Sequence, residues 1–321
     1  MSAPLFLLIP LFKTVPGLAA IIWLQSLISE SFRPANSVAI TMYAGHQNIT
    51  RAFSLNRMAI NLGFSIGPAL GGILSAISYN LLFFANSFGA LLAGIMYVYF
   101  FGKRHKKVPA EPVKENMSLH KHRDKSLSPY RDRLFIVFCI ICTLFAIFFF
   151  QFFNTIPIFY KDVAHLNKSS IGFILGYSGF LIVLLEMLMV NIAQKRWSIA
   201  QTLFCGTVTV ALSYSMLALS HHLVMLLLSI TMLSLGEILA LPFISTLTAL
   251  RAGKNNTGAY MGLNGMAFSV SFIITPFLGT TIASDFGFDR LWILSGAVLF
   301  FAAGGFYILV KKMQIHITPG H

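Results

Sequence analysis

Charged residues are scarce in this sequence: they make up 10% of its 321 residues, while 56% are hydrophobic. Soluble domains carry about 25% charged residues, so this chain has too little charge to cover a water-soluble fold. Its apolar residues instead form runs of about 20, the length that crosses the hydrocarbon core of a bilayer. The short alternating strands of a membrane barrel are also lacking. Because a backbone inside lipid must satisfy its own hydrogen bonds, the sequence predicts an all-α membrane protein.

Residue patterns that carry enzyme or metal chemistry are lacking too. Of only three cysteines, Cys139 and Cys142 form a C-x-x-C, but it lies in an apolar run without a second ligand pair. The histidines show no zinc-site spacing, and the phosphate-binding loop, G-x-S-x-G and H-E-x-x-H motifs do not occur. Residues 2–12 are apolar, but no basic segment precedes them as in a signal peptide. We therefore expect no catalytic residue, cofactor or metal, and no enzyme.

Nine apolar runs are long enough to span a membrane as helices. A shorter run, residues 2–12, comes before them and is too short to cross. The nine predicted spans are residues 17–42, 52–77, 80–101, 134–159, 170–193, 199–219, 222–249, 257–284 and 290–311.

The net charge of +13 is distributed unevenly over the loops between these spans. Loops on the side of residues 103–133 carry 17 Lys and Arg residues, and loops on the other side carry four. Basic loops stay in the cytoplasm, so the 103–133 segment and the C-terminus are expected there. This topology explains the charge without nucleic acid, and the expected partner is the lipid bilayer. The 103–133 segment is either a solvated linker or a site for lipid headgroups or a partner.

An internal repeat divides the chain. Residues 53–73 and 261–281 are identical at nine of 21 aligned positions, with an offset of 208 that superimposes Pro68 on Pro276. The preceding spans align at the same offset through Pro34 and Pro242. Apolar composition alone does not produce such matches in one register, so the repeat indicates two homologous bundles of six helices.

The repeat also predicts the domain organisation. Residues 134–321 hold helices 7–12, residues 103–133 are the basic cytoplasmic linker, and residues 1–102 are the remainder of the N-terminal bundle. That remainder comprises the end of helix 3 and helices 4–6. The expected fold is therefore nine full transmembrane helices plus a partial one, and an intact version would have about 400 residues. A misplaced start, a gene remnant and a real short form all stay open.

The pattern R-x3-N-x-G-x3-G-P-x2-G-G at residues 57–72 resembles the fifth-helix signature of drug:proton antiporters of the major facilitator superfamily. The residues that meet it are Gly63, Gly67, Pro68, Gly71 and Gly72, with Pro276 and Gly279 as counterparts in the second half. The chain departs from the family in lacking the G-x3-D-R-x-G-R loop, of which residues 191–197 hold only a degenerate echo.

This resemblance implies a major-facilitator-type helical bundle that exports small apolar or drug-like compounds by alternating access. It implies protons as the coupling ion, a small-molecule substrate, a monomer, and a multi-pass location in a bacterial inner membrane. Two alternatives remain: import of a sugar, peptide or metabolite, and a truncated membrane protein that transports nothing.

The glycines also have a physical interpretation. Gly63, Gly67 and Gly71 recur every four residues and share a helix face, and small faces let transmembrane helices pack closely. Pro68 removes a backbone hydrogen bond and bends the helix. The face is either a static helix contact or part of the seal across the membrane.

Five ionisable residues lie inside predicted spans, where charge is costly and usually functional. Glu30 and Arg33 are three residues apart and are expected to pair. Arg57 either reaches the headgroups or pairs with a carboxylate across the bundle, and Asn61 lies one turn deeper on the same face. Glu186 and Glu237 complete the set.

Glu237 lies near the middle of its span with no basic residue near in sequence. Burial favours the neutral form of such a carboxyl, which is what a proton carrier needs, and Glu186 is the second candidate. Alternatively, each is a neutral carboxyl held by neighbouring hydrogen bonds. Gln151 and Asn154 lie among phenylalanines in residues 145–154, which form either an aromatic substrate pocket or a packing surface.

Overall fold

The computed structural model describes residues 2–101, 128–253 and 256–313, and all regular structure in these ranges is helical. The predicted all-α class is therefore confirmed. Eight helices in these ranges are long and apolar enough to cross a membrane. The predicted count of nine spans plus a partial one is not confirmed, because residues 52–77 belong to the same continuous helix as residues 17–42.

The chain divides into two compact units. The smaller comprises Met1–Ala35 and Ile66–Lys125, and the larger comprises Asn36–Ser65 and Ser126–His321. The predicted bundle boundaries remain a prediction, and most of the 103–133 linker falls outside the described residues.

In the smaller unit, the short helix α1 (Ser2–Leu8) continues into a 3₁₀ turn (Ile9–Leu11) and packs against α3 (Tyr79–Phe101). The Ser87 hydroxyl on α3 donates a 2.8 Å hydrogen bond to the carbonyl of Ala3. Residues 2–12, predicted to be too short to span, are thus a helical piece held along a longer helix.

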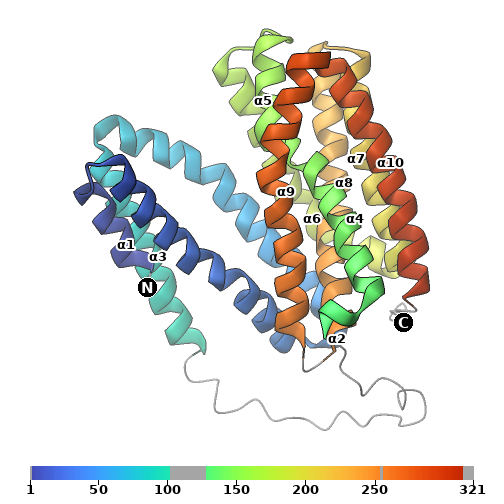
Figure 1. The fold of residues 1–321 in the computed structure, drawn as a ribbon, viewed down its shortest axis with the longest axis horizontal. Helices are drawn as coiled ribbons and strands as arrows, with labels where there is room; N and C mark the ends of the chain where they lie inside the picture. The colour runs from blue at the N-terminus through green and yellow to red at the C-terminus, as the bar shows by residue number, and fades with distance from the viewer. Residues whose placement is uncertain (1, 102–127, 254–255, 314–321) are drawn as a thin grey trace. The chain divides into compact units, whose positions relative to one another are not determined.

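Helix α2 (Val15–Ile77) is 63 residues long and turns back on itself (Figure 1). Twenty residues of straight helix extend about 30 Å. Yet Asn36 Nδ2 donates to Asn56 Oδ1, twenty residues later, at 3.1 Å. Phe53 and Ile49 are buried in a cluster that Ile40 also packs against. The larger unit therefore contains an antiparallel pair of α2 segments, which delivers residues 50–57 to its other helices.

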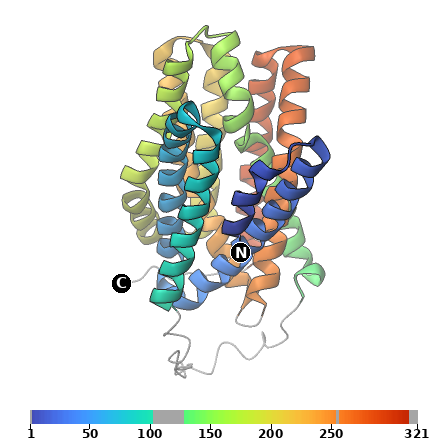
Figure 2. The ribbon, with the colours of Figure 1, turned by 90° about the vertical axis from the view of Figure 1, so that its left-hand side faces the viewer.

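Seven helices form the rest of the larger unit, and their long axes run roughly side by side in both views (Figures 1 and 2). They are α4 (Arg133–Phe149), α5 (Gln151–Asp162), α6 (Lys168–Arg196), α7 (Ile199–Leu219), α8 (Leu223–Ala252), α9 (Thr257–Phe286) and α10 (Phe288–Lys312). Helices α7 and α8 approach closely because Gly206 and Gly236 face each other. A Cβ at Gly236 would lie 2.7 Å from the Gly206 carbonyl oxygen.

One predicted span is built from two helices. Helices α4 and α5 are separated by Phe150, and together they cover the predicted span 134–159. A break inside a membrane frees carbonyl groups that need donors. Three side chains supply them: Tyr214 to Phe149 O at 3.2 Å, Thr275 to Ile147 O at 3.0 Å, and Asn154 to Phe150 O at 3.0 Å.

A polar cluster joins three helices at one end of the larger unit. Asp132 caps α4 by accepting from Phe135 N, and it receives two hydrogen bonds from Arg251 of α8, at 2.7 and 2.9 Å. Tyr260 of α9 donates to the same carboxylate at 3.1 Å. Burial alone would raise the pKa of Asp132, but the hydrogen bonds and charge of Arg251 outweigh it and hold that pKa below its ordinary value.

Candidate functional site

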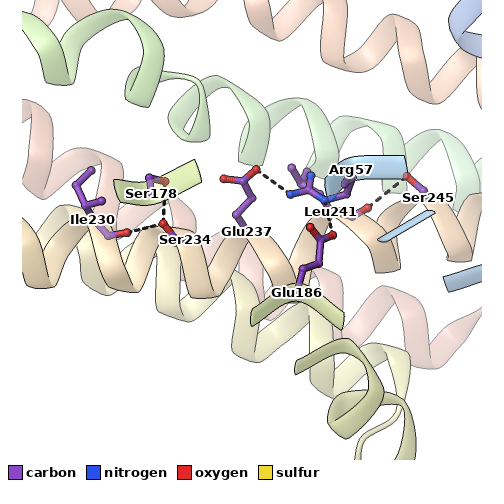
Figure 3. A network of polar contacts seen from close by, with 8 residues as sticks. All are labelled: Arg57, Ser178, Glu186, Ile230, Ser234, Glu237, Leu241 and Ser245. Carbon is purple, nitrogen blue, oxygen red and sulfur yellow. Dashed lines mark hydrogen bonds and ion pairs between the residues drawn. The ribbon is translucent and has the colours of Figure 1, made fainter. Parts of the chain in front are cut away.

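The larger unit holds one arginine between two carboxylates in the middle of its helices (Figure 3). Arg57 Nε on α2 lies 3.1 Å from Glu186 Oε1 on α6, and Arg57 Nη2 lies 2.8 Å from Glu237 Oε1 on α8. The side chain of Glu186 is fully buried, and those of Arg57 and Glu237 are 14% and 8% exposed. Of the two alternatives for Arg57, the structure therefore has the ion pair across the bundle. We call these three residues the charge triad.

Contacts between helices fix the position of the triad. Arg51, six residues before Arg57, donates to Asn191 on α6 at 2.6 Å. Thr50 shares a 3.0 Å hydrogen bond with Thr246 on α8. These two tethers hold the α2 segment against the same two helices that carry the carboxylates. On α8, Gly236 packs on α7, so the next residue, Glu237, is turned away from α7 toward the guanidinium.

The charges of the triad do not balance when all three groups are ionised. One guanidinium faces two carboxylates, which leaves one negative charge in an apolar surrounding. Glu186 Oε2 is buried and has no hydrogen-bond partner among the described residues. The hydroxyl of Ser54, one turn before Arg57 on α2, is also buried and interacts with the Glu186 carboxylate. A proton on one carboxyl would neutralise the triad, since burying an unpaired charge is costly.

Two other predicted site residues pair with each other in the smaller unit. Arg33 Nε lies 3.0 Å from Glu30 Oε2, as their spacing predicts. Their side chains are 75% and 55% exposed, and both belong to the smaller unit. Asn61 lies one turn beyond Arg57 on α2 and is partly buried. The structure thus brings together Arg57, Glu186 and Glu237 within the larger unit.

Gln151 and Asn154 make contacts that support helix packing. Gln151 is fully buried and donates to the Thr275 carbonyl of α9 at 3.3 Å, and it accepts a hydrogen bond from Thr155. A Cβ at Gly279 would collide with Gln151 Oε1 and Thr155 Oγ1, so this glycine lets α9 approach α5. Asn154 bonds within its own chain segment, to Phe150 O. A substrate role for Gln151 and Asn154 remains a prediction.

The glycine face of α2 is less packed than its spacing suggests. A Cβ at Gly63 or Gly67 would meet nothing within 4 Å among the described residues. At Gly71 it would lie 3.6 Å from Leu82 of α3, an ordinary van der Waals distance. The helix runs without interruption through Pro68 and Gly72. The role of this glycine face in helix packing therefore remains a prediction.

Sequence reasoning missed several residues around the triad. Ser54 and the Thr50–Thr246 pair carry hydroxyls that occur throughout the spans, so nothing in the sequence distinguishes them.

Asp132, in the polar cluster at one end of the larger unit, was also missed because it precedes its span and looks like an ordinary loop residue. An acidic residue just before an apolar run is a helix-capping signal that could have identified it.

Comparison with known proteins gives the family. The Major Facilitator Superfamily model matches residues 1–200 and 164–319. A Bacillus subtilis protein named uncharacterized MFS-type transporter YqjV is 24% identical over 86% of this chain and 67% of its own length. The multidrug resistance protein MdtH of Edwardsiella ictaluri is 25% identical over 74% of this chain. The chain covers 56% of the length of that MdtH.

The fold agrees with this relationship. The structure of the human organic anion transporter MFSD10 (TETRAN) superimposes with a TM-score of 0.68 and 15% sequence identity. The match covers 95% of this chain and 74% of the human one. Together with the membrane-length helices, these matches show that the chain is a multi-pass membrane protein that belongs to the Major Facilitator Superfamily of transporters.

Proposed function

We propose that this chain takes part in the proton-coupled export of small apolar or drug-like compounds across a bacterial inner membrane. The observation that supports this most is the charge triad, in which one arginine is shared by two buried carboxylates. Transport by the major facilitator fold involves two helical bundles that open alternately around a midplane site. The three residues of the triad come from helices of both sequence repeats, and Glu237 lies near the middle of α8.

The triad is suited to take up and release one proton. With both carboxyls ionised it carries a net charge of −1, and with one protonated it is neutral, so the proton changes the electrostatic cost of burial. The Ser54 hydroxyl interacts with the Glu186 carboxyl; it can donate to that carboxyl while it is ionised and accept from it once it is protonated. Proton relays inside membranes are commonly built from such carboxylates.

The orientation follows from loop charge. Arg51, Lys195, Arg196 and Arg251 lie at the end of the larger unit that also carries the Asp132 cluster. The positive-inside rule puts this end in the cytoplasm, with the C-terminus on the same side. The opposite end, where the α5–α6 and α7–α8 connections lie, would then face outward. Export of drug-like compounds is supported by the glycine–proline pattern at residues 57–72 and by the names of the MdtH relatives.

Glu237→Gln tests this proposal because it removes a titratable group while keeping the size of the side chain. In cells that produce the chain, we expect accumulation of the fluorescent cation ethidium to be lower than in cells with an empty vector. Glu237→Gln or Glu186→Gln should return accumulation to the empty-vector level, since no proton can then be exchanged at that carboxyl. Cell fluorescence at matched expression measures the effect.

Asp285→Asn is the matched control, because Asp285 is an exposed carboxylate at the end of α9, and it should leave accumulation unchanged. Unchanged export by Glu237→Gln would remove Glu237 from the mechanism. If the unmodified chain did not lower ethidium accumulation, export of this class of compound would be contradicted.

A further inference from the structure

Between Glu237 and the proposed outer end of the larger unit, α6 and α8 are joined by two pairs of hydroxyl groups. Ser178 Oγ and Ser234 Oγ lie 2.8 Å apart, and Tyr177 OH and Thr231 Oγ1 lie 3.2 Å apart. Ser178 and Ser234 are buried, whereas Tyr177 and Thr231 are partly exposed. Figure 3 shows the Ser178–Ser234 pair beside Glu237, on the side away from Glu186. We call these four residues the hydroxyl ladder.

The two ladder residues on α8 are spaced along the helix toward Glu237. Thr231, Ser234 and Glu237 follow one another at intervals of three residues on α8, so each step rises about 4.5 Å along the helix. The partly exposed pair lies farther from the carboxylate, and the buried pair lies nearer to it. Polar side chains thus recur along α6 and α8 between a partly exposed position and a buried carboxyl.

The hydrogen bonds of the ladder have a common direction. Ser234 Oγ donates to Ile230 O at 2.9 Å, and Thr231 Oγ1 donates to Leu227 O at 2.7 Å. Each α8 hydroxyl has only one proton, so within each pair the α6 hydroxyl is the donor. Each hydroxyl keeps accepting capacity, which a proton relay requires because every member must accept one proton as it gives up another.

We infer that the hydroxyl ladder conducts protons between the outer end of the larger unit and Glu237. This inference rests on the proposed proton-coupled function. In each step a hydroxyl oxygen accepts a proton from its outer neighbour while its own proton passes inward. Because three residues of helix rise about 4.5 Å, which exceeds the length of a direct hydrogen bond, the relay needs a bridging water molecule at each of these steps. The net result is one proton transferred to a Glu237 carboxylate oxygen, with no bond between heavy atoms formed or broken.

A purely structural role would be to hold α6 against α8, and the experiment must separate the two. Three ionisable groups interact electrostatically with Glu237: Arg57 on α2, Glu186 on α6 and Tyr214 on α7. None of them is changed by substitution in the ladder. The rate at which Glu237 gains a proton therefore reports on the route, while its equilibrium protonation reports on the triad.

The experiment uses the full chain in lipid nanodiscs and follows the infrared band of protonated carboxylic acid after a rapid drop in pH. The part of the band that disappears in Glu237→Gln belongs to Glu237. In Ser178→Ala/Ser234→Ala we expect this part to appear about 100-fold more slowly, the lower end of what a positioned proton-transfer group contributes. Its final amplitude should match that of the unmodified chain.

Two control variants keep the test decisive. Ser229 is a buried serine of α8 that donates to Ser213 O on α7 at 2.8 Å, so Ser229→Ala removes a comparable interhelical bond outside the ladder and should leave the rate unchanged. Ser178→Thr/Ser234→Thr keeps both hydroxyls and should retain the normal rate. Proton conduction by the hydroxyl ladder is overturned if Glu237 gains its proton at the normal rate in Ser178→Ala/Ser234→Ala, or if Ser229→Ala slows that rate equally. Either result leaves the proposed function standing. Failure of Glu237 to protonate in the unmodified chain overturns the proposed function as well.

Discussion

At the scale of single residues, the contacts of Arg57 depend on its residue type. Its planar guanidinium reaches Glu186 through Nε and Glu237 through Nη2, two carboxylates on different helices. A lysine would offer one compact charge and could not match this fork-like geometry. The same contacts make the arginine indispensable to the two acids, since buried carboxylates without a cation are strongly destabilising.

Arg57→Met should therefore lower the stability of the folded chain by about 3–5 kcal/mol, the usual cost of removing one partner from a buried ion pair. The triple variant Arg57→Met/Glu186→Gln/Glu237→Gln should recover much of this loss, because no charge is then left unpaired. Thermal unfolding in detergent, followed by the fraction of monodisperse protein, measures both. A triple variant no more stable than the single one would contradict this account of the triad.

At the scale of helices, close packing depends on small residues at defined crossings. Gly206 and Gly236 let α7 meet α8, and Gly279 lets α9 meet α5 over Gln151 and Thr155. The sequence repeat singled out Gly279 through its counterpart Gly71, but periodicity did not show which helix each would contact. That choice is made by the three-dimensional arrangement of the bundle, which no local pattern encodes.

Gly279→Leu should destabilise the larger unit, because even the first carbon of the new side chain would overlap Gln151 and Thr155. Overpacking of this kind costs about 1–3 kcal/mol or more. Gly265→Leu is the control on the same helix, since a Cβ there meets nothing within 4 Å among the described residues. The unfolding temperature in detergent should fall for Gly279→Leu only. An equal fall in both variants would show that helix propensity, not the α5 contact, is responsible.

At the scale of the whole molecule, composition and the length of the apolar runs predicted the helical membrane class, and the resemblance of residues 57–72 to the fifth-helix signature predicted the family. The individual members of the triad were also candidates, because each is an ionisable residue inside an apolar run. Their assembly was not predictable: Arg57 is separated from Glu186 by 129 residues and from Glu237 by 180. The continuity of α2 was missed because a reversal was expected to end the helix, whereas residues 43–51 stay helical through the turn.

The Asp132 cluster ties the ends of α4, α8 and α9 together, so it should make the stability of the larger unit depend on pH. The folded state lowers the pKa of Asp132, so its ionised form stabilises the fold at neutral pH. This contribution is present above the pKa of the unfolded chain and is lost as the pH falls through the lower pKa of the folded state. Asp132→Asn should therefore unfold at a lower temperature than the unmodified chain at pH 7.

The difference in unfolding temperature between Asp132→Asn and the unmodified chain should narrow as the pH falls below the ordinary pKa of an aspartate, about 4. Thermal unfolding in detergent over a series of pH values measures it. Asp162→Asn, at an exposed position near the opposite end of the unit, should have the same unfolding temperature as the unmodified chain at pH 7. If the unfolding temperature of Asp132→Asn stayed below that of the unmodified chain by the same amount down to the lowest pH, the carboxylate charge would not be what stabilises the cluster.

The interruption at Phe150 has a mechanical consequence. Bending an intact helix inside lipid separates backbone donors from acceptors, and nothing in the hydrocarbon replaces them. At this interruption, Tyr214, Thr275 and Asn154 already occupy the carbonyls that bending would expose. The angle between α4 and α5 can therefore change without a large loss of hydrogen bonding. The larger unit thus contains a joint at Phe150, where a change of angle would cost less backbone hydrogen bonding than the bending of an unbroken helix.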